Sequence, residues 1–365
     1  MATRLSERAE QITREILVAR IAGKEPMQIR KDFTNLDLSN APLNGGLFIE
    51  CCFRGADLTN AGLVEAAFSK CDLSRANLDG SNLDLASFTE CDLKQSSLRF
   101  SSLDKTNLID TDLSGADFSE AKLDITSILK CDLSQAIFHS AQLTHVSIIE
   151  GCLAEATFSF AKIKRINLVT CDIGGIGQRM SFSDAELDTP FFSGIDFTGT
   201  DFSNLKLHLP QFHESNVSNC NFAGLNLTQV GFSKANIDGA LFSDAVLDAA
   251  VFFGATIKNV DFSRVSAKNA IFVESVISDT SFRSAQLGFA QFSKAVIHSA
   301  DFSGSSLAQA SFLHADLSDC DFSGVSIKDA DLHFVVENNC RWNGVDKDSA
   351  QPISEERVRA ENWSK

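Results

Sequence analysis

The sequence lacks the features that mark membrane, secreted and metal-dependent proteins. No apolar run reaches the ~18 residues that a transmembrane helix needs. Residues 1–25 carry charges throughout and have no apolar signal-peptide centre, so a cytoplasmic protein is expected, with a secreted effector as the alternative. No Cys-x-x-Cys pair, phosphate-binding loop or nucleophile elbow is present. We therefore expect a protein that is not an enzyme and holds no metal or cofactor.

The chain also lacks the basic balance of a nucleic-acid-binding protein. Its net charge is −16, from 48 Asp and Glu against 32 Lys and Arg. A protein that binds nucleic acid through phosphate contacts needs a basic surface, so direct nucleic-acid binding is not expected. The acidic residues recur, mostly as Asp, just before a repeated apolar position, and these account for the net negative charge. The acidity therefore needs no partner to explain it.

The seven histidines are scattered along the chain. No two of them share a face with an acid at the spacing that a metal site needs. Each follows a repeated apolar position by one or two residues, where the side chain should point outward. We expect all of them to be exposed polar residues: His139, His145, His208, His213, His298, His314 and His333.

One five-residue pattern dominates the chain. From Phe33 to Ile173 every fifth residue is Leu, Phe or Ile, and from Phe182 to Leu332 every fifth residue is Phe, Leu, Ile or Val, except Ala267. The residue two before each of these centres is usually small, so one large and one small side chain point to the same side of an extended segment. A period of five fits neither an amphipathic helix nor a flat strand, and it indicates a repeat fold.

The units resemble the Ala-(Asp/Asn)-Leu-x-x consensus of the pentapeptide-repeat family. Examples are Ala56-Asp57-Leu58 and Ala116-Asp117-Phe118, and the resemblance covers residues 31 to 334. It implies an all-β fold, a right-handed four-sided parallel β-helix with four units per coil and about 15 coils in all. Short helices are expected at both ends.

The spacing of Phe and Cys agrees with four-sided coils. Phe occupies every tenth residue from Phe182 to Phe322, which places Phe on two opposite walls of a narrow core and aliphatic side chains on the other two. Eight cysteines take the small inward position, where a thiol acts as a compact apolar group. In a cytosolic protein these are expected to be reduced: Cys51, Cys71, Cys91, Cys131, Cys171, Cys220, Cys320 and Cys340.

The pattern divides the chain into five parts. These are an N-terminal helix and cap (1–30), a first repeat block (31–173), a Gly-rich frame break (174–181), a second, Phe-rich block (182–336) and a C-terminal tail (337–365). Three glycines in four residues allow unusual backbone angles at the break. The break is expected to be a bend or a widened section, or alternatively a protein contact at Gly177, Gln178 and Arg179.

Both ends depart from the repeat. Residues 3 to 23 have helical apolar spacing that Pro26 ends, and they predict a helix that caps the first coil, or alternatively a partner-binding or targeting helix. From Glu337 the pattern fails, Trp342 takes a central position alone, and a helix is predicted from Ser354 to about Trp363. This tail is expected to cap the last coil or to form a homodimer. Trp342 and Trp363 are candidate protein-binding residues.

Three functions remain open on the sequence. The architecture and the missing catalytic motifs favour a rigid, non-enzymatic scaffold that binds another protein. The family resemblance implies a second possibility, a bacterial DNA mimic that binds DNA gyrase, as quinolone-resistance members do. A third is an accessory or effector protein of a bacterial secretion system, with the N-terminal helix as its docking element.

Overall fold

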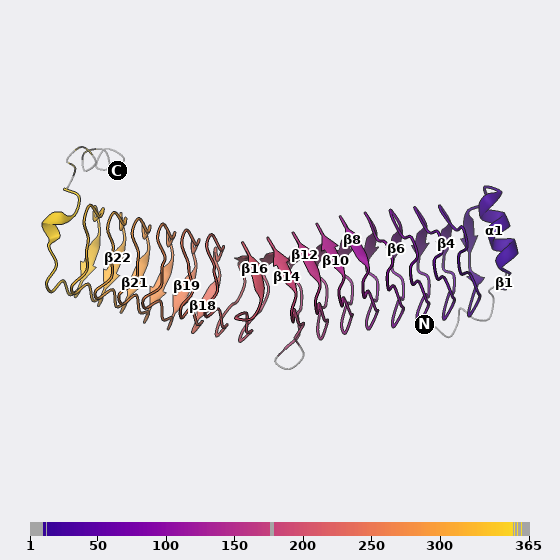
Figure 1. Cartoon of the computed structure of the whole chain (residues 1–365). Coiled ribbons are helices and arrows are strands. Elements are labelled where there is room, and N and C mark those ends of the chain that lie inside the picture. Colours follow the sequence, from indigo (N-terminus) through magenta and orange to yellow (C-terminus); the bar gives the residue numbers. More distant parts are fainter. Residues whose placement is uncertain are drawn as a thin grey trace. The chain divides into compact units, whose positions relative to one another are not determined.

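The computed structural model describes residues 10–11, 13–175, 179–352, 354, 356 and 359. It is a right-handed parallel β-solenoid of about 15 turns, which confirms the predicted fold class (Figure 1). Its coils fall into two compact units, Met1–Ile195 (unit 1) and Asp196–Lys365 (unit 2), and each unit is described by itself. The sequence break at 174–181 lies within unit 1, and the five-part division of the chain stays a prediction.

In unit 1, successive coils pair in parallel at a separation of 20 residues, as Phe48 with Phe68. One wall, here called strand face A, consists of β2 (Met27–Ile29), β4 (Leu47–Ile49), β5 (Ala67–Ser69), β6 (Ser87–Thr89), β7 (Asn107–Ile109), β9 (Ser127–Leu129), β11 (Ser147–Ile149), β13 (Asn167–Val169) and β15 (Phe191–Ser193). The wall before it, strand face B, consists of β8 (Lys122–Asp124), β10 (Gln142–Thr144), β12 (Lys162–Lys164) and β14 (Glu186–Asp188). The other walls pair through single bridges, such as Asp72 with Asp92.

The frame break is an insertion at one corner. Before it, Gln142 pairs with Lys162 at a separation of 20 residues, and after it Lys162 pairs with Glu186. The amide of Met180 donates to the carbonyl of Ile173 (3.0 Å), and Met180 takes the inward position that a small residue usually fills. Four extra residues therefore enlarge one corner, and the parallel register resumes beyond them.

In unit 2 the strands are β16 (Lys206–His208), β17 (Gln211–His213), β18 (Asn236–Asp238), β19 (Thr256–Lys258), β20 (Val276–Ser278), β21 (Val296–His298), β22 (Asp316–Ser318) and β23 (Val336–Asn338). Rings one coil apart stack, as Phe292 on Phe312 with centroids 4.7 Å apart. Rings on opposite walls meet edge to face, as Phe302 and Phe312 do at 6.1 Å. The predicted division of the core into two Phe walls is confirmed, because stacked and edge-on rings together fill its width.

The corners explain the polar positions of the repeat. Oδ1 of the Asp or Asn before a centre accepts a hydrogen bond from the amide two residues on, as Asp57 does from Thr59 (3.0 Å) and Asn77 does from Asp79 (3.0 Å). The second corner residue is left-handed, for example Asn60 with φ 54°. Asp is therefore used in forming the turn, which agrees with an acidity that needs no partner.

The inward cysteines are free thiols that donate hydrogen bonds between coils. Sγ of Cys71 donates to the carbonyl of Phe48 (3.3 Å), and Thr106 Oγ1 does the same to Leu83 (2.8 Å). Burial raises the pKa of the Cys131 thiol to about 11. Seven of the eight predicted inward cysteines are buried; Cys340 is only half-buried, because its coil is near the end of the repeat.

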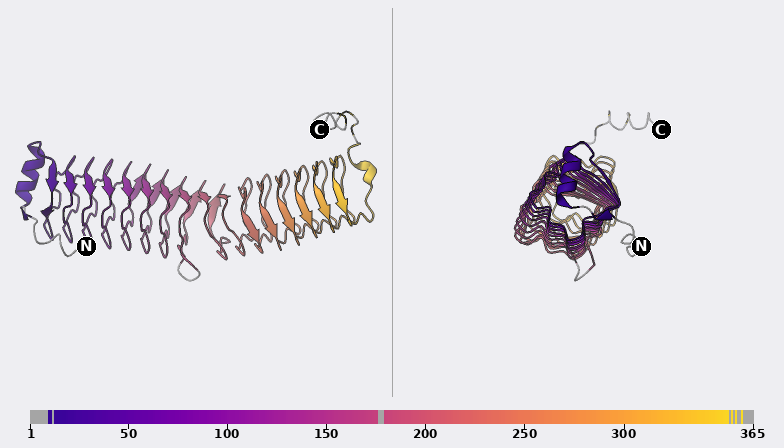
Figure 2. Two further views of the ribbon diagram at one scale, coloured as in Figure 1. Left: turned by 180° about the vertical axis from the view of Figure 1, so that it is seen from behind. Right: turned by 90° about the vertical axis from the view of Figure 1, so that its right-hand side faces the viewer.

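The N-terminal helix is shorter than predicted. Among the described residues, helix α1 spans Arg14–Ala22, and Glu10–Gln11 forms strand β1, which pairs with β3 (Lys31–Asp32). The predicted helix over residues 3 to 23 is therefore wrong at residues 10 and 11; residues 3–9 and 12 lie outside the described part. Leu17 of α1 is fully buried, and in the end-on view α1 lies in front of the coils of unit 1 (Figure 2).

At the C-terminal end, the polar segment after Asp346 forms the 3-10 helix η2 (Lys347–Ser349). Beyond it, the amide of Ser354 donates to Nε2 of His333 (2.7 Å), whose Nδ1 lies 2.6 Å from Oδ1 of Asp331. His333 is 5% exposed, so the prediction that every histidine is exposed is wrong here, because the tail covers this side chain. Glu356 and Arg359 are helical, and most of the predicted C-terminal helix lies outside the described residues.

Candidate protein-binding surfaces

The predicted contact residues occupy separate places. Trp342 is half-buried and stacks on Phe322 with ring centroids 4.2 Å apart, while Lys347 Nζ lies 4.2 Å from the Trp342 ring on unit 2. Arg179 is half-exposed beside Met180 in unit 1. Gly177, Gln178 and Trp363 lie outside the described residues. Trp342 thus extends a Phe column, and a role in partner binding stays a prediction for all five residues.

Among the described residues, no group of three or more His, Cys, Asp or Glu is placed to hold a metal ion. Within that same part of the chain, we find no helix with the length and hydropathy of a transmembrane span.

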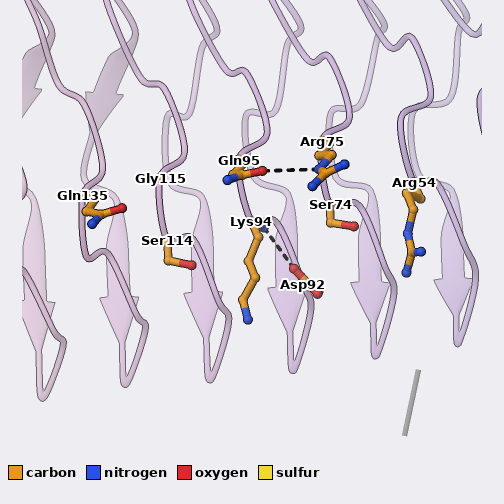
Figure 3. Close-up of a pocket in the computed structure, with 9 residues that line it drawn as sticks. All are labelled: Arg54, Ser74, Arg75, Asp92, Lys94, Gln95, Ser114, Gly115 and Gln135. Carbon is orange, nitrogen blue, oxygen red and sulfur yellow. Dashed lines mark hydrogen bonds between the residues drawn. The ribbon is translucent and has the colours of Figure 1, made fainter. Parts of the chain in front are cut away.

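A cavity of about 430 Å³ lies on unit 1 (Figure 3). It is lined by Arg54, Ser74, Arg75, Asp92, Lys94, Gln95, Ser114, Gly115 and Gln135. Nη2 of Arg54 lies 2.6 Å from Oδ2 of Asp72, and Nζ of Lys94 lies 2.9 Å from Oδ2 of Asp112. Hydrogen bonding to these carboxylates raises the pKa of Arg54 and of Lys94. Its lining is mainly polar and charged, so the cavity offers hydrogen bonds and ion pairs to a partner.

Large apolar side chains stand outward at the two corners that flank strand face B. Leu85 and Ile125 lie at the corner toward strand face A and are 47% and 51% exposed. Phe100 and Phe160 lie at the corner on the other side and are 53% and 55% exposed. All four have positive φ, between 52° and 61°. The equivalent corner position in most units holds a polar residue or Gly, which suits a left-handed backbone better.

Cations and histidines accompany these apolar groups. The guanidinium of Arg99 lies 5.3 Å from the centre of the Phe100 ring, and His139 meets the Phe160 ring edge to face at 5.5 Å. Strand β12 presents Lys162 and Lys164 as exposed side chains on strand face B. Exposed aromatic rings beside Arg are the composition of protein-protein contact centres.

The sequence does carry a signal for this surface, and the prediction missed it. The residue two after a centre is polar or Gly in most units, and Leu85, Phe100, Ile125 and Phe160 depart from that rule. This departure becomes informative once the backbone conformation is known, because the left-handed φ makes a bulky apolar residue unfavourable at this position.

Comparison with known proteins supports the repeat. The sequence model of pentapeptide repeats matches residues 51–90, 86–124, 211–244, 232–266, 261–298 and 297–333, which together cover more than half of the chain. No curated protein is significantly similar to the chain in sequence.

Several solved structures are similar to parts of the solenoid. A trypsin-treated variant of QnrB1, a plasmid-mediated fluoroquinolone resistance protein, is 24% identical, over 49% of this chain and 87% of its own, with a TM-score of 0.34. HetL, a pentapeptide-repeat protein of Nostoc sp. strain PCC 7120 involved in heterocyst differentiation regulation, is 17% identical, over 88% of this chain and 95% of its own, with a TM-score of 0.23. A pentapeptide-repeat protein of the Arabidopsis thaliana thylakoid lumen is 25% identical, over 27% of this chain and 70% of its own, with a TM-score of 0.26.

Proposed function

The chain belongs to the pentapeptide-repeat family, and we propose that it is a non-enzymatic scaffold that binds another protein through strand face B of unit 1 and its flanking corners. The observation that carries this proposal is the placement of Leu85, Phe100, Ile125 and Phe160, which are about half exposed in a left-handed backbone. A residue in such a conformation lowers stability, and its presence at an exposed site favours a functional reason over a structural one.

The interior supports a surface function. The centres of the repeat are filled by stacked rings and aliphatic side chains, as Phe118 on Phe138 with centroids 4.8 Å apart. Because these side chains fill the core, recognition has to use the outer surface. The partner that fits has apolar groups for Phe100 and Phe160 and acidic groups for Lys162 and Lys164.

The test replaces Phe100 and Phe160 together with Asn, which tolerates the left-handed backbone. We expect the F100N/F160N variant to be at least as stable as the natural protein in thermal unfolding, and to lose a partner that the natural protein captures from host-cell lysate. The matched control is Phe289→Asn, which makes the same change at an exposed left-handed corner of unit 2 (φ 61°, 53% exposed).

The partner should be identified by mass spectrometry and its binding repeated with purified protein. Loss of binding in F100N/F160N with retention in F289N supports the proposed surface. Equal binding by all three proteins removes strand face B as the contact and leaves the scaffold role to another face.

DNA gyrase is a second candidate partner, because one wall of unit 1 carries a row of consecutive carboxylates. Asp72, Asp92, Asp112 and Asp132 are bridged in sequence along this wall, at a spacing of about 4.8 Å. Arg54 and Lys94 lie among them and neutralise part of the row. A supercoiling assay with purified gyrase tests the candidate: unchanged supercoiling at micromolar protein removes it. The secretion-system role and the compartment stay predictions.

A further inference from the structure

Strand face A of unit 1 carries no outward charge from β2 to β13. The first and third residues of these strands point outward, and none of them is Asp, Glu, Lys, Arg or His. Apolar side chains form much of the surface. Met27 and Ile29 are exposed, and the half-buried ones are Leu47, Ile49, Ile109, Leu129, Ile149 and Val169. The same positions on strand face B hold Lys122, Asp124, Lys162 and Lys164. The strand conformation therefore tolerates charge, and its absence is particular to strand face A.

Charges return at the corner that follows strand face A, and their order along the coils is self-complementary. From the first coil onward the corner residues are Arg30, Glu50, Lys70, Glu90, Asp110, Lys130 and Glu150. Within the chain, neighbours pair along this row, with Arg30 Nε 2.8 Å from Glu50 Oε2 and Lys130 Nζ 3.8 Å from Glu150 Oε2. When the same row of a second copy runs beside it in the opposite direction, oppositely charged residues of the two copies face each other.

A two-fold axis at β6 places strand face A of a second copy against strand face A of the first. The coils of the two copies then run in opposite directions. This operation brings the same corner of both copies together. Arg30 then faces Glu150 of the other copy, Glu50 faces Lys130, and Lys70 faces Asp110. Only Glu90 meets its own equivalent, and within each chain Lys70 lies 3.6 Å from Glu90.

The corner that precedes strand face A obeys the same relationship. Glu65 faces Lys105 of the other copy, and Leu85 meets Leu85 at the axis. On the strands themselves, Ile29 faces Ile149 and Ile49 faces Leu129. The other apolar side chains of the face lie opposite small polar ones, as Met27 opposite Ser147 and Leu47 opposite Ser127. One symmetry operation thus matches charge with opposite charge on both edges, except at Glu90, and places no charge between them.

We propose that strand face A binds a second copy of this chain in an antiparallel, two-fold symmetric dimer. An isologous contact needs a surface that complements itself, which this face provides. Seven coils at about 4.8 Å give a length of ~34 Å, and a strand with its corners gives a width of ~15 Å. The buried surface is therefore ~1,000 Å² over both copies, at the lower limit of specific interfaces, and the dissociation constant should be micromolar.

Charge reversal at Glu65 and Lys105 tests the register. Each lies on a corner row beside Leu85, an uncharged neighbour, so reversal creates no like-charge neighbour along that row. Within its own chain Lys105 Nζ lies 3.0 Å from Oδ2 of Asp104, so the K105E change also breaks this ion pair, and thermal unfolding measures that cost separately from dimerisation. In E65K the introduced ammonium group faces Lys105 of the other copy, twice by symmetry, and the dimer dissociation constant measured by analytical ultracentrifugation should rise at least tenfold. The double variant E65K/K105E restores opposite charges and should return to within about threefold of the natural protein.

The control is Glu120→Lys, which makes the same change at an exposed left-handed corner away from strand face A (φ 59°, against 58° at Glu65). The dissociation constant of this variant should stay within about twofold of that of the natural protein. Circular dichroism and thermal unfolding establish that each variant is folded. A natural protein that stays monomeric at 100 μM overturns the proposal, and so does a dimer that E65K does not weaken or that the double variant does not restore. The F100N/F160N test addresses a different face, so either proposal can fail alone.

Discussion

The backbone amide of Met180 donates a 3.0 Å hydrogen bond to the carbonyl oxygen of Ile173, across an enlarged corner of unit 1. In a regular unit the same bond closes a two-residue corner, as from Ala161 to Phe158 (3.1 Å). The inserted residues therefore leave the hydrogen bonding of the coil intact at both ends of the corner.

Deletion of residues 174–177 should be tolerated. It restores a five-residue step from Ile173 to the next centre, and Met180 can still donate to Ile173. We expect thermal unfolding within about 2 °C of the natural protein, since a long corner contributes little to stability. The control deletes residues 134–137 at a regular corner. This deletion displaces every later side chain from the equivalent residue one coil away, and it should prevent folding. Unfolding of the 174–177 deletion would show that the enlarged corner itself stabilises unit 1.

Truncation of one stacked ring in unit 2 should be costly. Phe292 is fully buried between Phe272 and Phe312, with ring centroids 4.7 Å away on each side. Phe292→Ala leaves a cavity in the stack and should lower the free energy of unfolding by about 3–5 kcal/mol. Phe289→Ala, three residues away and 53% exposed, is the matched control and should change it by less than about 0.5 kcal/mol. Denaturant titration measures both; equal losses would argue against the ring stack.

Replacement of Ile125 by Asn should stabilise the protein. Ile125 has φ 52° and is 51% exposed, and a β-branched residue is unfavourable in this conformation. We expect a gain of about 0.5–1 kcal/mol in the free energy of unfolding. The reverse change, Asn60→Ile at φ 54°, should cost about 1–2 kcal/mol. A loss of stability in I125N would mean that the isoleucine makes contacts worth more than its backbone strain.

Acid should destabilise the protein through the corner aspartates. Hydrogen bonds from the side chain and amide of Ser203 lower the pKa of Asp201 below its usual 3.8, and those of Ser39 do the same for Asp37. Because the folded-state pKa is lower than the unfolded one, this stabilisation is present above pH ~4 and is lost as the pH falls through the folded-state pKa. The D37N/D201N variant keeps the acceptor oxygens and should move the acid-unfolding midpoint down by about 0.3 pH unit. No movement of this midpoint would contradict the assignment.

Much of the fold could be predicted because the repeat is local and regular. The alternation of Phe292 and Phe302 on opposite walls, and the inward placement of Cys71, follow from a period of five and four units per coil. Predictions that required knowledge of the ends were less successful. His333 comes directly after a repeated apolar position, as several of the exposed histidines do. It is nevertheless buried, because the C-terminal tail covers it and the amide of Ser354 donates a hydrogen bond to its imidazole.

The candidate surfaces could not be derived from the same rule. Phe100 and Phe160 are three predicted coils apart, so the 20-residue register already places them at one corner, but only the structure shows that this corner has a left-handed backbone, with φ 61° and 59°. The match between Glu65 and Lys105, or between Arg30 and Glu150, becomes visible only when residues are arranged in ladders and a second copy is turned about an axis. The repeat pattern along the sequence does not show this two-fold relationship between two copies.

The amino-acid sequence by itself determined the period, the parallel coils and the composition of the core, because each unit buries its own centre against the equivalent unit one coil away. The tertiary structure decided which corner residues have a left-handed backbone, which hydrogen bond closes the inserted corner and which polar side chains the chain ends cover. Those properties depend on backbone torsion angles and on contacts made by the chain ends, which a repeat pattern does not specify.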